Sequence, residues 1–341
     1  MAIQHAIALT VTTARYPLKA PFNITGHRMT ATAVVMVTMQ CGSHVGRGEA
    51  AGVFYLENND PPGMIKQIEA VRPRIEAGVE RHALQSLLPP GGARNALDCA
   101  LWDLEAKLTD RPAWQTAGLE SPRPLLTTFT VSANTPEKMA VDARAYTGAK
   151  ALKLKLTGQP NDADRVRAVR EVSPTAWLGV DANQGFTRAS LEALLPVLID
   201  NRVQLIEQPF RIGQDAELER LRSPIRIAAD ESVQRLADVA QLVGRYDVIN
   251  IKLDKCGGLT EGLAMAREAR RRGLSVMVGN MLGSSLAMAP AFLLGQLCDV
   301  VDLDGPVFLS EDCAPAVRYD EGMISVPAAL WGHPTSAHGQ A

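Results

Sequence analysis

Five charged residues recur at a nearly constant spacing through the second half of the 341-residue chain. Each one closes a short apolar segment, and together they are Lys155, Asp181, Glu207, Asp230 and Lys252. The steps between them are 26, 26, 23 and 22 residues (155→181→207→230→252), so each step fits one strand–helix unit. Because an apolar strand of this kind is buried on both faces, a charged residue at its end needs a partner. The series therefore predicts that the five side chains meet at one site.

The three acidic residues of the series, Asp181, Glu207 and Asp230, predict a metal site. Any one of them alone could be half of an ion pair, but three converging carboxylates repel one another unless a cation lies among them. Oxygen ligands without His or Cys select a hard ion, and we expect Mg²⁺, with Mn²⁺ able to replace it. Three protein ligands leave positions open for water or a substrate carboxylate, so the ion can act as a Lewis acid.

Two lysines flank the acidic residues in the series and are candidate acid/base groups. In a ring of eight strands, the segments that end in Lys155 and Lys252 lie four apart and therefore on opposite walls. Lys153 points to the same side as Lys155, so the sequence alone does not say which of the two is the base. A lysine base must be neutral, and a nearby cation and second ammonium lower its pKa from about 10.4 toward about 7–8. Proton removal by one lysine and proton return by the other would invert a stereocentre next to a carboxylate.

Eight short apolar segments alternate with amphipathic stretches from about residue 125 to about residue 304. Their connections suit right-handed parallel crossovers, and eight such strands close a parallel barrel. The eighth segment runs into a loop without a clear helix, so we expect an α/β fold of the modified (β/α)8 TIM type, written (β/α)7β. Catalytic side chains of such barrels lie at the carboxyl ends of the strands. The eight segments are residues 127–132, 151–156, 176–182, 203–209, 225–231, 247–253, 275–280 and 300–305.

The start of the chain has a different pattern from the barrel. Residues 1–56 alternate apolar with small polar side chains, as half-buried antiparallel strands do, and residues 62–118 carry helical periodicity. We therefore expect an α+β capping domain over residues 1–120 and the catalytic barrel over residues 121–314. The remaining residues, 315–341, include one short strand, and we expect them to return to the cap and to end in a disordered tail.

Composition excludes several classes of function. With 46% apolar and 21% charged residues and a net charge of −2, the chain is an ordinary globular protein without a surplus of charge for nucleic acid or an anionic membrane. No apolar stretch reaches the roughly 20 residues that span a bilayer, and the N-terminus lacks a signal-peptide pattern, so we expect a cytoplasmic protein. The five cysteines form no CxxC pair, and the six histidines show no metal-ligand spacing. Reduced thiols are therefore expected, and a zinc site or a histidine-based triad is disfavoured.

The motifs around these residues resemble those of a known family. Nearly end to end, the chain resembles the muconate-lactonizing subgroup of the enolase superfamily, and most closely its dipeptide epimerases of the L-Ala-D/L-Glu type. The motifs that carry the resemblance are KLK at 153–155, VDAN at 180–183, IEQP at 206–209, ADES at 229–232, NIKLDKCGGLTE at 250–261, DLDGP at 302–306 and, in the cap, ARNALDCALWDL at 93–104.

The resemblance implies an activity and a role for each site residue. The implied metal ligands are Asp181, Glu207 and Asp230. Lys155 and Lys252 would exchange the α-proton of the C-terminal residue of a dipeptide through an enediolate intermediate. Lys153 would assist as a third catalytic lysine by neutralising the substrate carboxylate. The resemblance also implies that the protein is a homo-oligomer.

Two further acidic residues, Asp302 and Asp304, end the eighth predicted strand. Their spacing of two puts both carboxylates on one face of the strand. They either cap the turn before Gly305 and pair with basic neighbours, or they form a pocket for a cationic group. A dipeptide offers such a group in its α-ammonium, and in the epimerases that the chain resembles the corresponding pair binds that ammonium.

Two loops supply other candidate substrate contacts. Arg28, in the loop between the first two strands, suits the carboxylate of a glutamate or aspartate side chain, although a solvated loop arginine has the same pattern. A loop of this kind can close over the barrel mouth and exclude water. Ser284, which follows the seventh strand, either presents backbone N–H groups to the substrate or is an ordinary helix N-cap.

Two alternatives to a dipeptide epimerase stay open. Sister activities of the same subgroup, namely N-acylamino acid racemase, o-succinylbenzoate synthase and muconate cycloisomerase, use the same lysines and metal. The Asp302 and Asp304 pair argues against them, because their substrates carry no ammonium. A non-catalytic barrel that binds a small ligand or a protein is the alternative from another class, and the presence of all five strand-end residues disfavours it. The sequence therefore predicts an isomerase that acts on L-Ala-Glu or a similar dipeptide.

Overall fold

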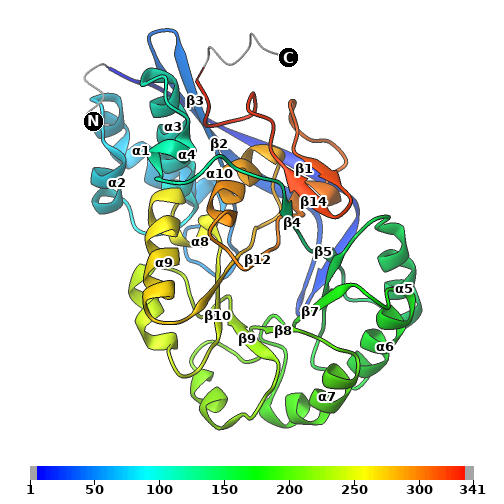
Figure 1. The fold of residues 1–341 in the computed structure, drawn as a ribbon. Coiled ribbons are helices and arrows are strands. Elements are labelled where there is room, and N and C mark those ends of the chain that lie inside the picture. The colour runs from blue at the N-terminus through cyan, green and yellow to red at the C-terminus, as the bar shows by residue number, and fades with distance from the viewer. Residues whose placement is uncertain (1–5, 335–341) are drawn as a thin grey trace.

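The structure is a computed structural model that describes residues 6–334, and the predicted tail beyond residue 334 lies outside the described residues. An antiparallel sheet of three strands opens the chain, and helices pack against it as the sequence predicts for the cap (Figure 1). The strands are β1 (Ala8–Ile24), β2 (His27–Cys41) and β3 (His44–Ala51). The helices are α1 (Pro61–Glu76), α2 (Arg81–Leu87) and α3 (Gly92–Leu108).

Helix α3 lies between the cap sheet and the barrel and is buried along almost its whole length. It approaches β3 closely because Gly48 of β3 has no side chain at the contact. A Cβ on Gly48 would lie 2.1 Å from the carbonyl oxygen of Ala96. On the barrel side, Asp98 accepts the backbone N–H of Thr260 at 2.9 Å. A single helix therefore joins the cores of the two parts.

Eight parallel strands follow in one sheet, in chain order from β5 to β12. The sheet closes where Thr128, next to β5, donates its N–H to the carbonyl oxygen of Val301 in β12 at 2.9 Å. All eight strands fall within the segments expected from the sequence, so the predicted barrel is confirmed. The strands are β5 (Phe129–Val131), β6 (Ala151–Lys155), β7 (Trp177–Asp181), β8 (Leu205–Glu207), β9 (Arg226–Ala229), β10 (Val248–Ile251), β11 (Ser275–Val278) and β12 (Val300–Val301).

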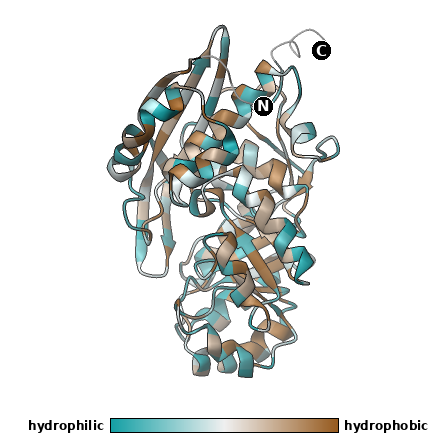
Figure 2. Cartoon of the chain, turned by 90° about the vertical axis from the view of Figure 1, so that its left-hand side faces the viewer, coloured by the Kyte–Doolittle hydropathy of each residue, from teal (hydrophilic) through white to brown (hydrophobic). Residues whose placement is uncertain are grey.

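Helices surround the barrel strands, which are apolar, while the helices mix apolar and polar residues (Figure 2). The connections after β8 and β9 hold only the 3-10 helices η1 (Asp215–Arg220) and η2 (Leu236–Leu242), and η3 (Gly305–Phe308) replaces the last barrel helix, as predicted. No helix of the described part of the chain is long and apolar enough to cross a membrane. The α-helices are α5 (Pro136–Ala145), α6 (Asp162–Val172), α7 (Arg188–Asp200), α9 (Leu259–Arg271), α10 (Ser285–Gly295) and the short α4 (Ala113–Thr116) and α8 (Leu253–Cys256).

The interior of the barrel is apolar at one end and charged at the other. Side chains alternate along each strand, so residues two apart face the same interior. The apolar end is a cluster of Leu205, Ala228, Val248, Met277 and Val300. Two positions further along the same strands stand Glu207, Asp230, Asn250 and Asp302. Alternation thus places the polar groups at the carboxyl ends, above a packed apolar floor.

The chain comes back to the cap after the barrel. Strands β13 (Arg318–Asp320) and β14 (Met323–Ser325) pair with β4 (Leu125–Leu126) in a small antiparallel sheet. Beyond this sheet, the indole N–H of Trp331 donates to the carbonyl oxygens of Arg47 and Cys99, each at 3.1 Å. These bonds tie the C-terminal segment to β3 and α3.

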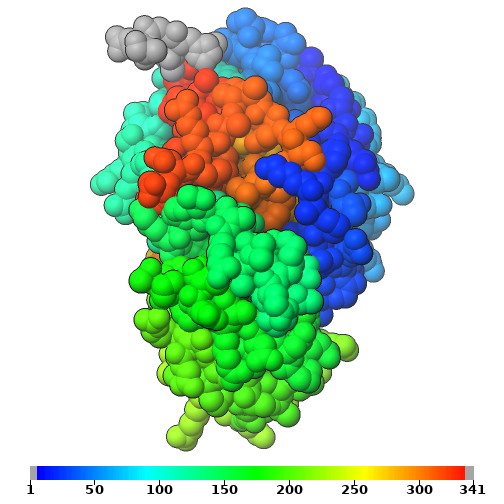
Figure 3. All heavy atoms as spheres, turned by 90° about the vertical axis from the view of Figure 1, so that its right-hand side faces the viewer, coloured from blue at the N-terminus to red at the C-terminus, as the bar shows by residue number. Residues whose placement is uncertain are grey.

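The cap also lies directly on the barrel, as the blue and orange atoms of Figure 3 show. Glu49 of β3 accepts the backbone N–H of Ser284 at 2.7 Å, and it accepts the Ser284 hydroxyl as well. Only 2% of Glu49 is exposed, and this burial raises its pKa to about 7, although both bonds from Ser284 act in the opposite direction. The folded protein therefore holds a proton on Glu49 more tightly than the unfolded chain does.

Replacement of Glu49 by Gln should change how stability depends on pH. Between the usual pKa of 4.5 and the folded value of about 7, the folded state keeps a proton that the unfolded chain has lost, so stability falls as pH rises through this window. The free energy of unfolding of the wild type, relative to Glu49→Gln, should fall by up to about 3 kcal/mol between about pH 4 and about pH 8. Urea unfolding of both proteins measures this difference, and parallel pH profiles would contradict it.

Candidate functional site

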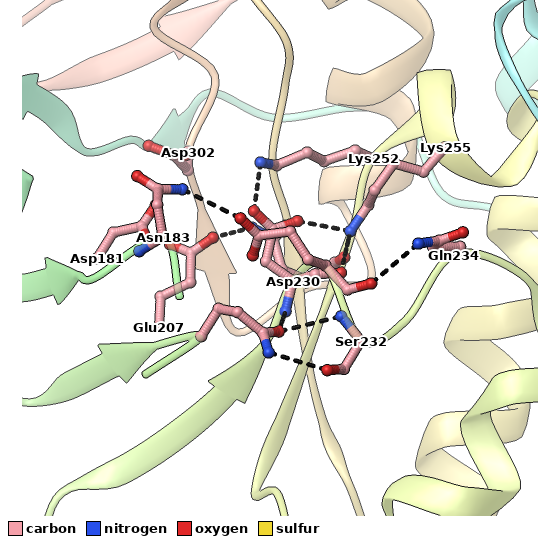
Figure 4. A network of polar contacts seen from close by, with 12 residues as sticks. Asp181, Asn183, Glu207, Asp230, Ser232, Gln234, Lys252, Lys255 and Asp302 are labelled. Atoms are coloured by element: carbon pink, nitrogen blue, oxygen red, sulfur yellow. Dashed lines mark hydrogen bonds and ion pairs between the residues drawn. The ribbon is translucent and has the colours of Figure 1, made fainter. Parts of the chain in front are cut away.

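Three carboxylates meet at the carboxyl ends of adjacent barrel strands (Figure 4). Asp181 ends β7, Glu207 ends β8, and Asp230 follows β9 directly. One oxygen of each lies within 4.8 Å of the others, and all three side chains are buried. The parallel pairing of Asp181 with Glu207 across β7 and β8 brings the first two together. This geometry suits one small cation held by oxygen ligands.

Lys155 and Lys252 lie on the two sides of these carboxylates. The Nζ atom of Lys155 is 2.5 Å from Oδ2 of Asp181, and Nζ of Lys252 is 2.6 Å from Oδ2 of Asp230. Their strands, β6 and β10, are four positions apart in the ring of eight, so the lysines extend from opposite walls. Burial would lower the pKa of Lys252, but Asp230 and its neighbouring carboxylates raise it above its usual value. The structure thus brings together all five residues of the charged series.

Lys153 stands two residues before Lys155 on β6, so both side chains point into the interior of the barrel. Its ammonium contacts Asp302 and lies 3.3 Å from Oε2 of Glu207. Burial alone would lower the pKa of Lys153, but Asp302 and Glu207 raise it above its usual value. Lys153 is therefore a permanent positive charge that faces both the metal site and the end of β12.

Asp302 and Asp304 lie just beyond β12 and line the same cavity as the lysines. Asp302 accepts the Thr128 hydroxyl as well as the Lys153 ammonium, and Asp304 accepts the backbone N–H of Thr130 at 2.6 Å. Burial, with a further effect of the adjacent Asp302, raises the pKa of Asp304 to about 6. Both carboxylates have protein partners and still face the cavity.

The negative charge at the metal site is incompletely compensated. Burial and then Asp181 raise the pKa of Glu207 to about 7, against the effect of Lys153. Glu207 accepts the side-chain N–H of Asn250 at 2.6 Å through Oε1, while Oε2 receives no hydrogen bond from the described residues. The Lys153 ammonium, 3.3 Å from this Oε2, also pairs with Asp302 and therefore compensates Glu207 only in part. A divalent cation would supply the missing partner. The donor set therefore fits Mg²⁺.

Asn250 and Lys255, which the sequence analysis missed, hold the carboxylates in place. Lys255 donates to both Oδ1 and the carbonyl oxygen of Asp230, each at 2.5 Å. Burial would raise the pKa of Asp230, but Lys252 and Lys255 lower it well below its usual range. Asn250 could have been found, because it stands two residues before Lys252 on one strand. Lys255 lies in the one-turn helix α8, where strand alternation gives no signal.

Two predicted substrate contacts lie outside the cavity. Arg28 is exposed beside the turn between β1 and β2 and pairs with Asn23, whereas the next residue, Met29, lines the cavity. Ser284 is the N-cap of α10, and its backbone N–H and hydroxyl both donate to Glu49. In this conformation neither residue is brought to the lysines.

A cavity of about 560 Å³ opens above the carboxylates, between the barrel and the cap. Its cap wall is largely apolar and includes Ile24, Met29 and Phe54. Its barrel wall carries the three lysines together with Asp230, Glu231, Asp302 and Asp304. This is enough space for a small molecule with a charged end at the barrel and an apolar or flexible part toward the cap.

Two family models match the chain. The model described as "Mandelate racemase / muconate lactonizing enzyme, N-terminal domain" matches residues 6–118, and "Enolase C-terminal domain-like" matches residues 137–332. Over 311 residues the chain is 40% identical to "L-Ala-D/L-Glu epimerase" of Escherichia coli (strain K12), which covers 91% of this chain and 96% of the relative.

Two solved structures share the fold. An enolase family member from Agrobacterium tumefaciens with homology to dipeptide epimerases, bound to sodium and L-Ala-L-Glu, is 42% identical, covers 96% of this chain and 100% of its own, and has a TM-score of 0.92. The dipeptide epimerase of Cytophaga hutchinsonii, complexed with Mg and D-Ala-L-Val, is 26% identical, covers 94% of each chain and has a TM-score of 0.87. With its acidic triad, its flanking lysines and both family models matched, the chain belongs to the mandelate racemase/muconate lactonizing enzyme group of the enolase superfamily.

Proposed function

We propose that this protein is an isomerase: a Mg²⁺-dependent dipeptide epimerase that inverts the α-carbon of the C-terminal residue of L-Ala-Glu or a similar dipeptide. The observation that carries this proposal is the position of Lys155 and Lys252 on opposite walls of the barrel, with the acidic triad between them. A substrate carboxylate bound at this triad would place its α-carbon between the two lysines. Few other arrangements give a proton donor or acceptor on each face of one carbon.

Asp181, Glu207 and Asp230 are the residues that would hold Mg²⁺. When bound, the ion supplies positive charge that stabilises the negative charge of the substrate carboxylate as the α-proton leaves. In the structure two of these carboxylates are paired with Lys155 and Lys252. A cation held by these carboxylates would compete with the lysines for the same oxygens, and it would lower the pKa of Lys252 from its raised value toward that of a base.

Lys155 and Lys252 then move the proton. One removes the α-proton from its own face of the substrate, and the other donates a proton to the opposite face, which gives the inverted configuration. The reverse reaction exchanges the two roles. Lys153, held by Asp302, supplies a fixed positive charge beside the carboxylate and stabilises the enediolate that forms between the two transfers.

Asp302 and Asp304 support a dipeptide substrate, since a free α-ammonium several bonds from the carboxylate can reach the far wall of the cavity. Arg28 would meet an acidic side chain of the second residue only if the hairpin tip at Gly26 folds over the cavity. Ser284 would act through its loop, whose Met281 and Leu282 line the cavity.

An N-acylamino acid racemase is the second candidate. The Asp302 and Asp304 carboxylates already accept hydrogen bonds from Thr128 and Thr130, so a substrate without an ammonium would not leave them without partners. The lysines and the acidic triad would act in the same way on such a substrate. The two candidates therefore differ only in what binds at the end of β12.

We further propose a cytoplasmic homo-oligomer without nucleic-acid or membrane partners. All five cysteines are free thiols, which supports a reducing compartment. The proposal of an oligomer rests on the family resemblance alone.

The metal site can be tested without substrate. In the wild type, Mg²⁺ at about 100 times its Kd should stabilise the fold by about 2.7 kcal/mol and raise Tm. Glu207→Gln should remove most of this shift because it removes a charged ligand. Lys155→Met should enlarge the shift, because Asp181 loses its counter-charge. Asp142→Asn, at a partly exposed acid on α5, is the control that should behave as the wild type. Equal shifts in the wild type and in Glu207→Gln would contradict the assignment.

The proton transfer can be tested in D₂O with Mg²⁺ and a set of L,L-dipeptides. In the wild type, deuterium should enter the second residue of L-Ala-L-Glu, and L-Ala-D-Glu should appear. Lys155→Ala and Lys252→Ala should each lower epimerisation by about 10²–10⁴-fold, while each keeps exchange on the isomer whose proton faces the remaining lysine. Mass spectrometry measures the incorporation of deuterium, and chiral chromatography measures the formation of the epimerised dipeptide. No exchange in any dipeptide, with turnover of an N-acyl amino acid, would favour the racemase.

A further inference from the structure

The loop between β3 and α1, residues 52–60, forms part of the cap wall of the cavity. It is fixed at its base, because Val53 donates its N–H to the carbonyl oxygen of Asn59 at 3.1 Å. The buried side chain of Asn59 in turn accepts the N–H of Gly92, at the start of α3, at 2.8 Å. The loop is therefore held in one position over the barrel mouth.

Tyr55 belongs to this fixed loop and lines the same cavity as Asp230, Lys155 and Lys252. Its ring packs edge-on against Phe54, with centroids 5.1 Å apart and planes at 88°, and Phe54 lies against His27 of the hairpin tip, with centroids 4.0 Å apart. The hydroxyl is buried and has no hydrogen-bond partner among residues 6–334. Burial, then Asp230 and Glu231, raise the pKa of Tyr55 well above its usual value, so the phenol keeps its proton.

A buried hydroxyl without a partner is rare in a folded protein and needs an explanation. Tyr55 lines the same cavity as Asp230 and Glu231 of the barrel, but its hydroxyl bonds to none of the described carboxylates. Asp181, Glu207 and Asp230 would hold a cation at the strand ends, next to the cavity that lies between the barrel and the cap. A substrate carboxylate bound to that cation from the cavity would lie between the barrel and Tyr55.

We propose that the Tyr55 hydroxyl donates a hydrogen bond to the carboxylate of the bound dipeptide, and so acts as a further catalytic residue on the cap. This inference rests on the proposed function, since it assumes a substrate carboxylate at the metal site. Negative charge on that carboxylate grows as the α-proton leaves, so the donor is worth more in the transition state than in the ground state. Tyr55→Phe should therefore lower kcat more than it raises KM. A lost hydrogen bond to a charged group predicts a fall in kcat/KM of about 10- to 100-fold.

The decisive test separates ligand states by their thermal stability. Wild type and Tyr55→Phe are compared without ligand, with Mg²⁺ alone, and with Mg²⁺ plus L-alanyl-2-methylglutamate, which has no α-hydrogen to exchange. Without ligand, the variant should be at least as stable as the wild type, because it loses only an unpaired hydroxyl. The two proteins should respond equally to Mg²⁺, and the variant should gain less Tm from the dipeptide analogue.

Tyr146→Phe is the matched control. The Tyr146 hydroxyl donates to the carbonyl oxygen of Thr130 at 2.9 Å, so its loss should lower Tm by the same amount in all three states. A smaller Tm increase of Tyr55→Phe with Mg²⁺ alone would overturn the proposal, because it would indicate that the hydroxyl bonds to water around the ion and not to the substrate. Loss of stability without ligand would also overturn it, since the hydroxyl would then have a partner in the free protein.

The α-deuterium assay separates this proposal from the proposed function. If the wild type exchanges no dipeptide, the proposed function fails. If the wild type exchanges dipeptides and Tyr55→Phe matches it in kcat, in KM and in its thermal response to the analogue, only the role of Tyr55 fails.

Discussion

The mouth of the barrel depends on the neutralisation of carboxylates that are buried side by side. Asp181, Glu207 and Asp230 have no more than 1% of their surface exposed, so water cannot screen their repulsion. Lys155 and Lys252 each pair with one of them, whereas the third, Glu207, has only the more distant Lys153, which also pairs with Asp302. A buried ion pair is weak evidence for stability, because desolvation offsets its Coulomb attraction, but loss of one partner is strongly destabilising. The site is therefore a balanced set of charges in which a cation and the lysines compete for the same oxygens.

This balance requires that the groups be held where they cannot relax away from one another. The parallel register and the alternation of side chains supply the rigidity, since Glu207, Asp230 and Asp302 each stand two residues after an apolar residue of the barrel floor on the same strand. Glu207 stands two residues after Leu205, and Asp230 two residues after Ala228, both of which pack in the floor. Movement of one carboxylate would disturb that packing. The apolar floor thus fixes the geometry of the polar site as well as stabilising the fold.

The strand ends were predictable from sequence because their positions follow from two simple periods: two residues along a strand and one strand–helix unit along the chain. The positions of Lys155 and Lys252 on opposite walls follow from counting strands. Other features depend on contacts between segments whose relative positions no sequence periodicity predicts. Ser284 turns to Glu49 because the cap lies on the barrel, and Arg28 faces away from the cavity because the strands extend to the hairpin turn at Gly26. From sequence, the residues around Arg28 are interpreted as a loop, and that interpretation gives no information about which strand face the arginine occupies.

The cap completes the site with the same residues that attach it to the barrel. Within a short stretch of chain, Gly48 lets α3 approach β3, Glu49 binds the β11–α10 loop, and Tyr55 lines the cavity that also contains Asp230. A substrate that gains a contact with Tyr55 therefore gains it from an element whose position is already set by buried hydrogen bonds. Such preorganisation means that little further ordering is needed when the substrate binds, and the cap can then exclude water without first having to fold onto the barrel. The same short stretch of chain, β3 and the loop that follows it, therefore both attaches the cap to the barrel and completes the wall of the site.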